Sequence, residues 1–317
     1  MTWRPNASVD TAIARARMLN SVRSFFAQRD VLEVSTPTLS SRTATDPNIE
    51  SIVTRWSGRD LYLQTSPEHH MKRLLAAGYP DIYQVCKVFR DGEAGRRHMP
   101  EFTMLEWYRL GIGLPAIIEE TTNLVSKLLV KKKLDESPQL ISYSDAFENA
   151  LSLDPMTTDV ASMAKAVNAD EQLRVSIGDD LDAWLDLAMA SQVASTFATN
   201  RLTAVYHYPQ SQAALAQICP QDDRVADRFE LYCGPLELAN GFVELTDANE
   251  QRTRFLADQD KRKASGCRHL EIDESLIDAL QEGLPPSAGV ALGLDRVLML
   301  DQGQDDIHSV VTFNPGF

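Results

Sequence analysis

The chain has 317 residues, of which 44% are hydrophobic and 24% are charged. This is the composition of an ordinary soluble globular protein, and the length suffices for one large core or one core with a small appendage. The 45 acidic and 31 basic residues give a formal charge of −14, which argues against broad nonspecific nucleic-acid binding, because such binding depends on cations that neutralise phosphates.

The cysteines and the apolar segments exclude several other classes of protein. Cys86, Cys219, Cys233 and Cys267 are scattered, with no C-x-x-C pair and no histidine at ligand spacing. The sequence therefore predicts neither a zinc site nor a disulfide framework. No apolar segment reaches the length of a membrane span, and the N-terminus lacks the apolar region of a signal peptide. We expect a cytoplasmic protein without membrane contacts.

The N-terminal part predicts a helix followed by a strand. Apolar residues recur at helical spacing over 11–29, and either Ser8 or Asp10 is a suitable N-cap. Residues 31–34 are predicted to form a strand, which ends before Pro37 because proline cannot continue regular pairing.

The next part predicts a second helix after a polar segment. Residues 41–60 are polar and are expected to form a mobile connection. A strand over 61–65 then leads to a helix over 67–78, with proline in its first turn. Ser66 would cap this helix, and the carboxylate of Glu68 suits its positive end.

Residues 87–109, KVFRDGEAGRRHMPEFTMLEWYR, predict a β-hairpin with a charged loop. Asp91, Gly92 and Gly95 interrupt two runs of β-forming residues. Guanidinium groups on a fixed loop suit a triphosphate, and aromatic faces suit a base. The plainer alternative is a hairpin with a solvated charged tip. The candidate groups on the loop and return strand are Arg90, Glu93, Arg96, Arg97, His98, Glu101, Glu106 and Tyr108.

The second half predicts helices and then antiparallel strands. An amphipathic helix is expected over 114–130, and an inserted helical module over 140–200. A strand is expected over 202–209. Two further strands should flank a turn at 234–235, and a helix should begin near residue 247.

Three glutamates in the predicted strands lie seven residues apart, at Glu230, Glu237 and Glu244. A bend or bulge at Asn240 and Gly241 would aim two of them into one site. Neighbouring buried carboxylates are costly unless a cation joins them, and magnesium on ATP phosphates would be that cation. The alternative is that each glutamate lies on the wet face of an antiparallel strand.

The last motif is SAGVALGLDRVLML, residues 287–300. Gly289 and Gly293 permit close approach of the backbone to a ligand. Asp295 is predicted to open a helix and Arg296 to reach a phosphate. Taken alone, the segment also fits simple packing of a strand against a helix.

Three of these segments resemble motifs 1, 2 and 3 of the class II aminoacyl-tRNA synthetases, in that order: the N-terminal helix and strand that end at Pro37, the hairpin of residues 87–109, and residues 287–300. The runs RHMPEFTMLEWY and ELANGFVELTDA resemble the lysyl branch of that family. The resemblance implies an α+β fold, with an antiparallel sheet flanked by helices. It also implies a single catalytic domain over 1–317 with a helical insertion at 140–200, and a homodimer formed through motif 1.

The resemblance assigns roles to individual residues. Glu68 receives the amino group of the amino acid, and Glu230 and Glu237 hold magnesium and ATP. Arg90 and Arg296 are the implied catalytic residues. The implied ATP contacts are Arg90, Asp91, Gly92, Glu93, His98, Met99, Phe102, Glu237, Leu238, Gly293 and Arg296. The implied amino-acid pocket comprises Ser66, Glu68, Glu106, Tyr108, Asn240, Glu244 and Ala291.

The chemistry of these groups fits lysine activation. A lysine ε-ammonium needs a negative pocket, which Glu106, Tyr108 and Glu244 would provide, and the α-carboxylate needs a cation such as Arg90. In-line attack of that carboxylate on the α-phosphorus releases pyrophosphate, and Arg90, Arg296 and Mg²⁺ would stabilise the developing charge.

Three departures from the lysyl-tRNA synthetase pattern bear on the acceptor and on the nucleotide contacts. No anticodon-binding OB-fold precedes motif 1, and Ala291 stands where those enzymes have glycine. Both features resemble the lysyltransferases that activate (R)-β-lysine, or lysine less well, and transfer it to a lysine of elongation factor P. The third departure lies in motif 2, where Gly92 precedes Glu93 and Met99 replaces an asparagine.

Other functions stay open from the sequence. The nearest is a minimal lysyl-tRNA synthetase-like ligase, although the acidic charge and the missing OB-fold disfavour tRNA as acceptor. A regulatory paralogue that binds an amino acid without catalysis is another, disfavoured because Arg90, Glu230, Glu237 and Arg296 are all retained. Ammonia-dependent asparagine synthesis is more remote, because the pocket is of the lysine type.

Overall fold

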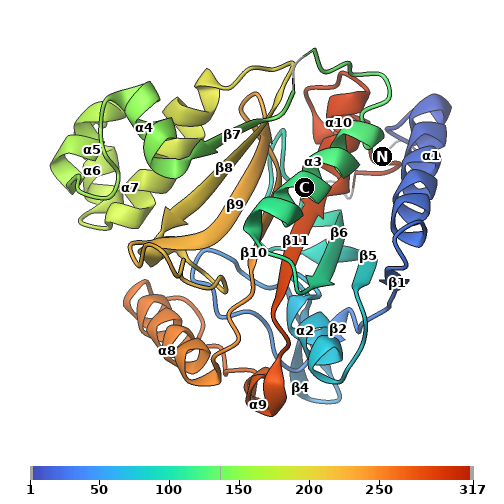
Figure 1. The fold of residues 1–317 in the computed structure, drawn as a ribbon, viewed down its shortest axis with the longest axis horizontal. Helices are drawn as coiled ribbons and strands as arrows, with labels where there is room; N and C mark the ends of the chain where they lie inside the picture. Colours follow the sequence, from blue (N-terminus) through green and yellow to red (C-terminus); the bar gives the residue numbers. More distant parts are fainter. Residues whose placement is uncertain (1–2, 136, 315–317) are drawn as a thin grey trace. The chain divides into compact units, whose positions relative to one another are not determined.

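The computed structural model describes residues 3–135 and 137–314. The chain forms two compact units (Figure 1). The first unit comprises residues 1–132 together with 244–317, and the second unit comprises residues 133–243.

The first unit contains four strands in the order β1-β5-β6-β11. They are β1 (Leu32–Glu33), β5 (Ile82–Phe89), β6 (Glu101–Leu110) and β11 (Ser287–Gly293). β5 and β11 are both antiparallel to β6, whereas the short β1 pairs with β5 in parallel. The predicted hairpin is confirmed as β5 and β6, with its charged loop between them.

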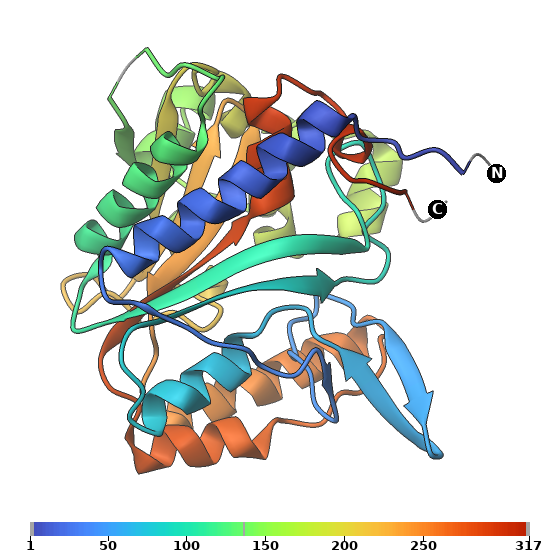
Figure 2. The same cartoon turned by 90° about the vertical axis from the view of Figure 1, so that its right-hand side faces the viewer.

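Helices lie on both sides of these strands: α1 on one side of β5 and β6, and α2, α8 and α9 on the other (Figure 2). Phe26 of α1 stacks on Tyr83 with 4.4 Å between ring centroids and lies 5.6 Å from Trp107, which fixes α1 against β5 and β6. The helices of the first unit are α1 (Val9–Ala27), α2 (Glu68–Ala76), α3 (Leu114–Leu128), α8 (Ala248–Ala264), α9 (Glu274–Gly283), α10 (Leu294–Asp301) and the short η4 (Ile307–Ser309).

Local sequence signals set the start of the N-terminal helix. Of the two candidate caps, Ser8 is the N-cap, because its side chain accepts a hydrogen bond from the backbone of Thr11 at 3.1 Å. The helix ends at Ala27, two residues earlier than predicted, and Asp30 then adopts φ 56° as the chain turns toward β1.

The prediction of a mobile connection over residues 41–60 was wrong. The segment contains β3 (Val53–Trp56) and the start of β4 (Arg59–Leu63), which form a three-stranded sheet with β2 (Leu39–Ser40) in the order β2-β4-β3. Both turn residues have positive φ, 49° at Ser57 and 80° at Gly58, as in a two-residue hairpin turn. The predicted strand over 61–65 overlaps β4, whereas β3 was missed because it is short and mostly exposed, although the Ser-Gly pair was a usable turn signal.

The second unit contains four strands in the order β10-β9-β8-β7. They are β7 (Gln139–Ser142), β8 (Leu202–Pro209), β9 (Val225–Cys233) and β10 (Leu236–Val243). β8, β9 and β10 pair in antiparallel fashion, and β7 pairs with β8 in parallel. The turn predicted at 234–235 joins β9 to β10, and Gly234 takes φ 55° there.

Short helices pack on these strands of the second unit. They are α4 (Tyr143–Leu151), α5 (Val160–Ala166), α6 (Glu171–Ile177), α7 (Leu181–Ala188), η1 (Met189–Val193), η2 (Ala194–Thr196) and η3 (Gln210–Gln212). Trp184, Leu185 and Ala188 of α7 are buried in one core with Val205 of β8. This apolar core positions the helices on the sheet.

The bulge predicted at Asn240 and Gly241 lies elsewhere. Asn240 is paired with Glu230 in regular register, and the irregularity falls between Glu237 and Ala239. Leu238 lies at the bulge and is 2% exposed, so its side chain belongs to the core.

Along the described ranges, no helix combines the length and the apolar character that crossing a membrane requires. All four cysteines are free thiols.

Candidate active site

Three glutamates of the first unit surround one buried lysine. The Nζ of Lys72 lies 2.7 Å from Oε1 of Glu68, one helical turn earlier on α2, and 2.5 Å from Oε2 of Glu244. The third carboxylate, Glu106 of β6, lies close enough for the Lys72 charge to lower its pKa. Lys72, Glu106 and Glu244 are at most 2% exposed. A cluster of this kind is costly to build and suggests a site rather than a structural ion pair.

Hydrogen bonds fix the third carboxylate. Ser66 accepts from the backbone N–H of Glu68 at 3.0 Å and donates to Oε2 of Glu106 at 2.8 Å. The hydroxyl of Tyr108 donates to Oε1 of Glu106 at 2.7 Å. The prediction that Ser66 caps α2 was wrong, because the helix begins at Glu68 and its N-cap is Pro67. Ser66 instead binds the first backbone N–H of the helix and positions Glu106.

Burial controls the protonation of this cluster. It raises the pKa of Glu106 to about 8, with a further contribution from Glu68. It also raises the pKa of Glu244 to about 8, against the opposing effect of Lys72. Burial alone would lower the pKa of Lys72, but the carboxylates of Glu244 and Glu68 outweigh it and raise that pKa. The pocket therefore holds one permanent cation and carboxyl groups that ionise when another cation enters.

Strand β11 forms one wall of the pocket. Gly289 pairs with Tyr108, and Ala291 pairs with Glu106, so both face the same side as these two groups. A Cβ at residue 289 would come within 2.4 Å of Oε1 of Glu244 and 2.5 Å of Cε1 of Tyr108. Only glycine fits at 289, whereas Ala291 places a methyl group beside Glu106.

A pH dependence of ammonium binding follows from the raised pKa values of Glu106 and Glu244. Below about pH 8 these groups carry protons in the free protein, and a bound ammonium group favours their ionised forms. With L-lysine as the probe of an ammonium ligand, we expect the affinity to rise from pH 6.5 to 8, by up to about 10-fold per pH unit for each carboxyl that ionises. Calorimetry at pH 7 should show proton release, as a binding enthalpy that varies with the ionisation enthalpy of the buffer. Binding without proton release would contradict this assignment.

The hairpin loop gathers a second, cationic group of side chains in the first unit. Arg90 lies 3.5 Å from Glu93 and 5.2 Å from the ring of Phe102. Arg296 of α10 donates to Nε2 of His98 at 2.8 Å, so this nitrogen is the acceptor. Burial and the neighbouring Arg296 lower the pKa of His98, which keeps the ring neutral. Two arginines held on a hairpin and a helix suit a polyphosphate.

Two other residues of the loop, Met99 and Gly92, are predicted nucleotide contacts and can contribute only backbone atoms. Met99 is 4% exposed, so its thioether belongs to the core and only its backbone is available. Gly92 has φ 77° with open space where a side chain would be, and its N–H donates to Oδ1 of Asp91 at 2.9 Å. Glycine at 92 is therefore required by the turn.

A buried aspartate that sequence reasoning placed only at the start of a helix connects the third motif to the hairpin. Asp295 accepts from the backbone N–H of Thr103 at 2.6 Å and forms an ion pair with Arg15 of α1. It lies in the first turn of α10, two residues after Gly293 and directly before Arg296. The contacts of Asp295 hold the start of α10, which carries Arg296, against β6 and α1.

The second unit holds the two predicted metal ligands, Glu230 and Glu237. Arg228 lies 2.7 Å from Oε1 of Glu230 and 3.3 Å from Oδ1 of Asn240, and the Tyr232 hydroxyl donates to Oε2 of Glu230. Burial, followed by the charge of Glu237, raises the pKa of Glu230. The predicted metal pair is therefore close in space, and Arg228, which the sequence analysis did not single out, links it to Asn240.

Within the first unit, the structure brings together most of the predicted amino-acid pocket: Ser66, Glu68, Glu106, Tyr108, Glu244 and Ala291. Asn240 and Leu238 belong to the second unit, and the side chain of Leu238 lies in its core. Lys72 was missed. Its position four residues after Glu68, on the same face of the helix, was the available signal.

The class of protein is defined by a family model. Residues 1–315 match the model of the tRNA synthetases class II (D, K and N). An α+β fold with the three motifs in order, an acidic pocket and a cationic hairpin agrees with this match.

Curated relatives narrow the assignment. The chain is 44% identical over 319 residues to a protein of Klebsiella pneumoniae subsp. pneumoniae, and 46% identical over 322 residues to a protein of Pseudoalteromonas translucida. In both cases the match covers 98% of this chain and 97% of the relative, and both relatives carry the name elongation factor P–(R)-β-lysine ligase. The chain therefore belongs to the class II synthetase family and, within it, to the elongation factor P–(R)-β-lysine ligases.

Proposed function

We propose that this protein uses ATP to activate a diamino acid, (R)-β-lysine or lysine, as an aminoacyl-adenylate. It then transfers the aminoacyl group to the ε-amino group of a lysine on elongation factor P. The proposal places the reaction in the cytoplasm, where free thiols such as the four found here persist.

The charge of the acidic pocket is the observation that carries the choice of substrate. Three carboxylates, from Glu68, Glu106 and Glu244, surround the single ammonium of Lys72. With all carboxylates ionised, two negative charges are uncompensated. A diamino acid brings two ammonium groups, so its binding neutralises the pocket, whereas a monoamino acid would leave one buried charge unpaired.

The two proposed chemical steps need no side-chain nucleophile. A carboxylate oxygen of the amino acid attacks the α-phosphorus of ATP, and the bond to pyrophosphate breaks. The neutral ε-amine of the acceptor lysine then attacks the adenylate carbonyl, loses a proton and displaces AMP. Arg90 and Arg296 would stabilise the negative charge that develops on the phosphate oxygens.

Glu230 and Glu237 are the proposed magnesium ligands. The charge of Glu237 raises the pKa of Glu230, and a divalent cation relieves repulsion of this kind. Magnesium would neutralise charge on the ATP phosphates when bound.

A homodimer is also part of the proposal. Ile13 of α1, Leu32 of β1 and Leu39 of β2 are 41–45% exposed, although they are large and apolar. α1 and β1 form the motif 1 region that the resemblance places at a dimer interface, and β2 follows directly after it. Sedimentation equilibrium measures the oligomeric state directly. A monomer at micromolar concentration would contradict the proposed homodimer.

An acceptor competition tests the proposed function. Purified protein receives ATP, magnesium and labelled (R)-β-lysine or L-lysine, with elongation factor P in one tube and bulk tRNA in another. We expect label on elongation factor P that resists mild base, as an amide does. Base-labile label on tRNA would instead indicate a minimal tRNA ligase, and the absence of both label and pyrophosphate exchange would indicate a regulatory protein.

Ala291→Gly should change which isomer is activated. Removal of the methyl group beside Glu106 should raise activation of L-lysine relative to (R)-β-lysine, within the ~1–3 kcal/mol that a methyl-sized change supplies. The ratio of pyrophosphate-exchange rates measures this. Ala288→Gly is the matched control, because Ala288 lies on the same strand but faces the other side. An unchanged ratio in Ala291→Gly would remove Ala291 from the specificity argument.

A further inference from the structure

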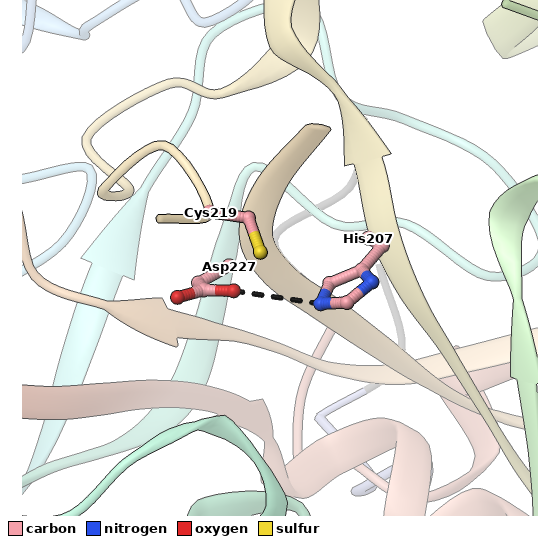
Figure 3. A group of neighbouring side chains, drawn as sticks. All are labelled: His207, Cys219 and Asp227. Atoms are coloured by element: carbon pink, nitrogen blue, oxygen red, sulfur yellow. Dashed lines mark ion pairs between the residues drawn. The ribbon is translucent and has the colours of Figure 1, made fainter. Parts of the chain in front are cut away.

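A histidine, a cysteine and an aspartate of the second unit lie close together, and none of the three has a role in the proposed reaction. His207, Cys219 and Asp227 each offer one ligand atom, and the three atoms lie within 4.8 Å of one another. Figure 3 shows the sulfur of Cys219 beside the space between the Asp227 carboxylate and the imidazole ring. The spacing of these residues in the sequence gave no hint of the cluster, because three separate segments supply them.

The backbone is arranged to bring the histidine there. Tyr206 pairs with Phe229 and Tyr208 pairs with Ala226. His207 therefore stands opposite the two residues between Ala226 and Phe229, and one of these is Asp227. His207 adopts φ 60°, a conformation that non-glycine residues rarely take. The register of β8 and β9 is irregular between Tyr206 and Tyr208, as at a β-bulge, and Nε2 of His207 lies 3.5 Å from Oδ1 of Asp227.

Backbone hydrogen bonds also fix the position of Cys219. Its N–H donates to the carbonyl of Val225 at 2.9 Å, and the N–H of Asp227 donates to the carbonyl of Gln217 at 2.9 Å. Cys219 and Asp227 are therefore diagonal neighbours on one face of a short antiparallel pair. The cysteine is 4% exposed and His207 is partly exposed, so the cluster has a buried side and a side open to solvent.

The geometry favours a metal over a catalytic relay. In a cysteine–histidine–acid relay, the acid and the thiol contact different ring nitrogens. Here Nε2 faces Asp227, and Figure 3 shows the sulfur on that same side of the ring. Tetrahedral zinc with bonds of about 2.0–2.3 Å to nitrogen, oxygen and sulfur needs ligand atoms about 3.3–3.6 Å apart, which matches the 3.5 Å separation of Nε2 and Oδ1.

We propose that His207, Cys219 and Asp227 form a binding site for a thiophilic divalent cation, with Zn²⁺ as the preferred ion and solvent as the fourth ligand. Sulfur and imidazole ligands select zinc over magnesium, so the site is distinct in chemistry from any magnesium site on carboxylates alone. Bound metal would cross-link β8 to the 217–219 segment and to the start of β9.

Cobalt substitution tests the proposal without any assay of ligase activity. Untagged, chelator-treated protein is titrated with Co²⁺ and then with Zn²⁺. We expect one equivalent of Co²⁺ to give the near-ultraviolet charge-transfer band of a cobalt–thiolate bond, and Zn²⁺ to abolish the band by displacement. Zinc should also raise the midpoint of thermal unfolding.

Variants assign the ligands. Cys219→Ser should lose the charge-transfer band, and His207→Gln and Asp227→Asn should each weaken Zn²⁺ binding by about 100-fold or more. Cys233→Ser is the control, because it removes another buried thiol of the same unit and should leave the band intact. His207→Gln changes a partly exposed side chain, so it stays informative if Cys219→Ser does not fold. The proposal is overturned if the native protein shows no band, or if the band survives in Cys219→Ser or disappears in Cys233→Ser.

Discussion

Lys72→Met is expected to lower the free energy of unfolding by about 3–5 kcal/mol at pH 8.5, because it leaves the buried carboxylates of Glu68 and Glu244 without their cation. Methionine fills nearly the same volume, so packing changes little. At pH 5.5 the loss should be much smaller, since Glu244 and Glu106, whose pKa values are raised to about 8, then carry protons. Urea unfolding at pH 5.5 and pH 8.5 measures the difference. Pyrophosphate exchange should also fall, because the carboxylates of the pocket lose the cation that positions them.

The exposed pair on β5 and β6 provides the control for this experiment. Lys87 lies 3.1 Å from Glu101, but both side chains are nearly half exposed. Lys87→Met should therefore change the stability by no more than about 0.5 kcal/mol at either pH. An equal loss in Lys72→Met at pH 5.5 and 8.5 would mean that packing, rather than charge, is the role of Lys72.

Glu244→Gln is expected to reduce lysine-dependent pyrophosphate exchange by about 10³-fold or more while ATP binding stays nearly unchanged. The substitution keeps the shape of the side chain but removes a charge that lies 2.5 Å from Lys72 and against Gly289. The pocket then retains only one uncompensated negative charge for two incoming ammonium groups. Exchange kinetics measure the loss of activation, and calorimetry with ATP measures nucleotide binding.

Glu101→Gln supplies the comparison for Glu244→Gln, because it removes a carboxylate from the exposed part of β6 and should leave both measurements unchanged. If Glu244→Gln abolished ATP binding as well, Glu244 would belong to the nucleotide or metal site instead of the amino-acid pocket.

Much of the fold was predictable because its signals are local. The apolar periodicity and the Ser8 cap defined α1, and the breakers between two β-forming runs defined the β5–β6 hairpin. The failures have physical causes as well. β3 is short and mostly exposed, so it shows little of the alternation that marks a strand. The β10 bulge lies between Glu237 and Ala239 and not at the glycine that the sequence offered as a breaker.

The candidate pocket could be predicted only in part from the sequence. The resemblance to a known family singled out Glu68, Glu106 and Glu244, whose side chains the fold then brings together. It gave no role to Lys72 or to Asp295, because their importance depends on burial and on partners far away in the sequence. The same limit applies to the cluster around His207, which exists only once β8 and β9 are paired.

The close packing at Gly289 also determines how this enzyme can be engineered or can diverge. A side chain at 289 would collide with Glu244 and Tyr108, whereas Ala291, two residues further along the same strand, already accommodates a methyl group. Residue 291 can therefore change in size to alter the choice of substrate, whereas residue 289 must stay glycine. A library intended to make this ligase accept new amino acids for protein labelling should randomise residue 291 and keep glycine at 289.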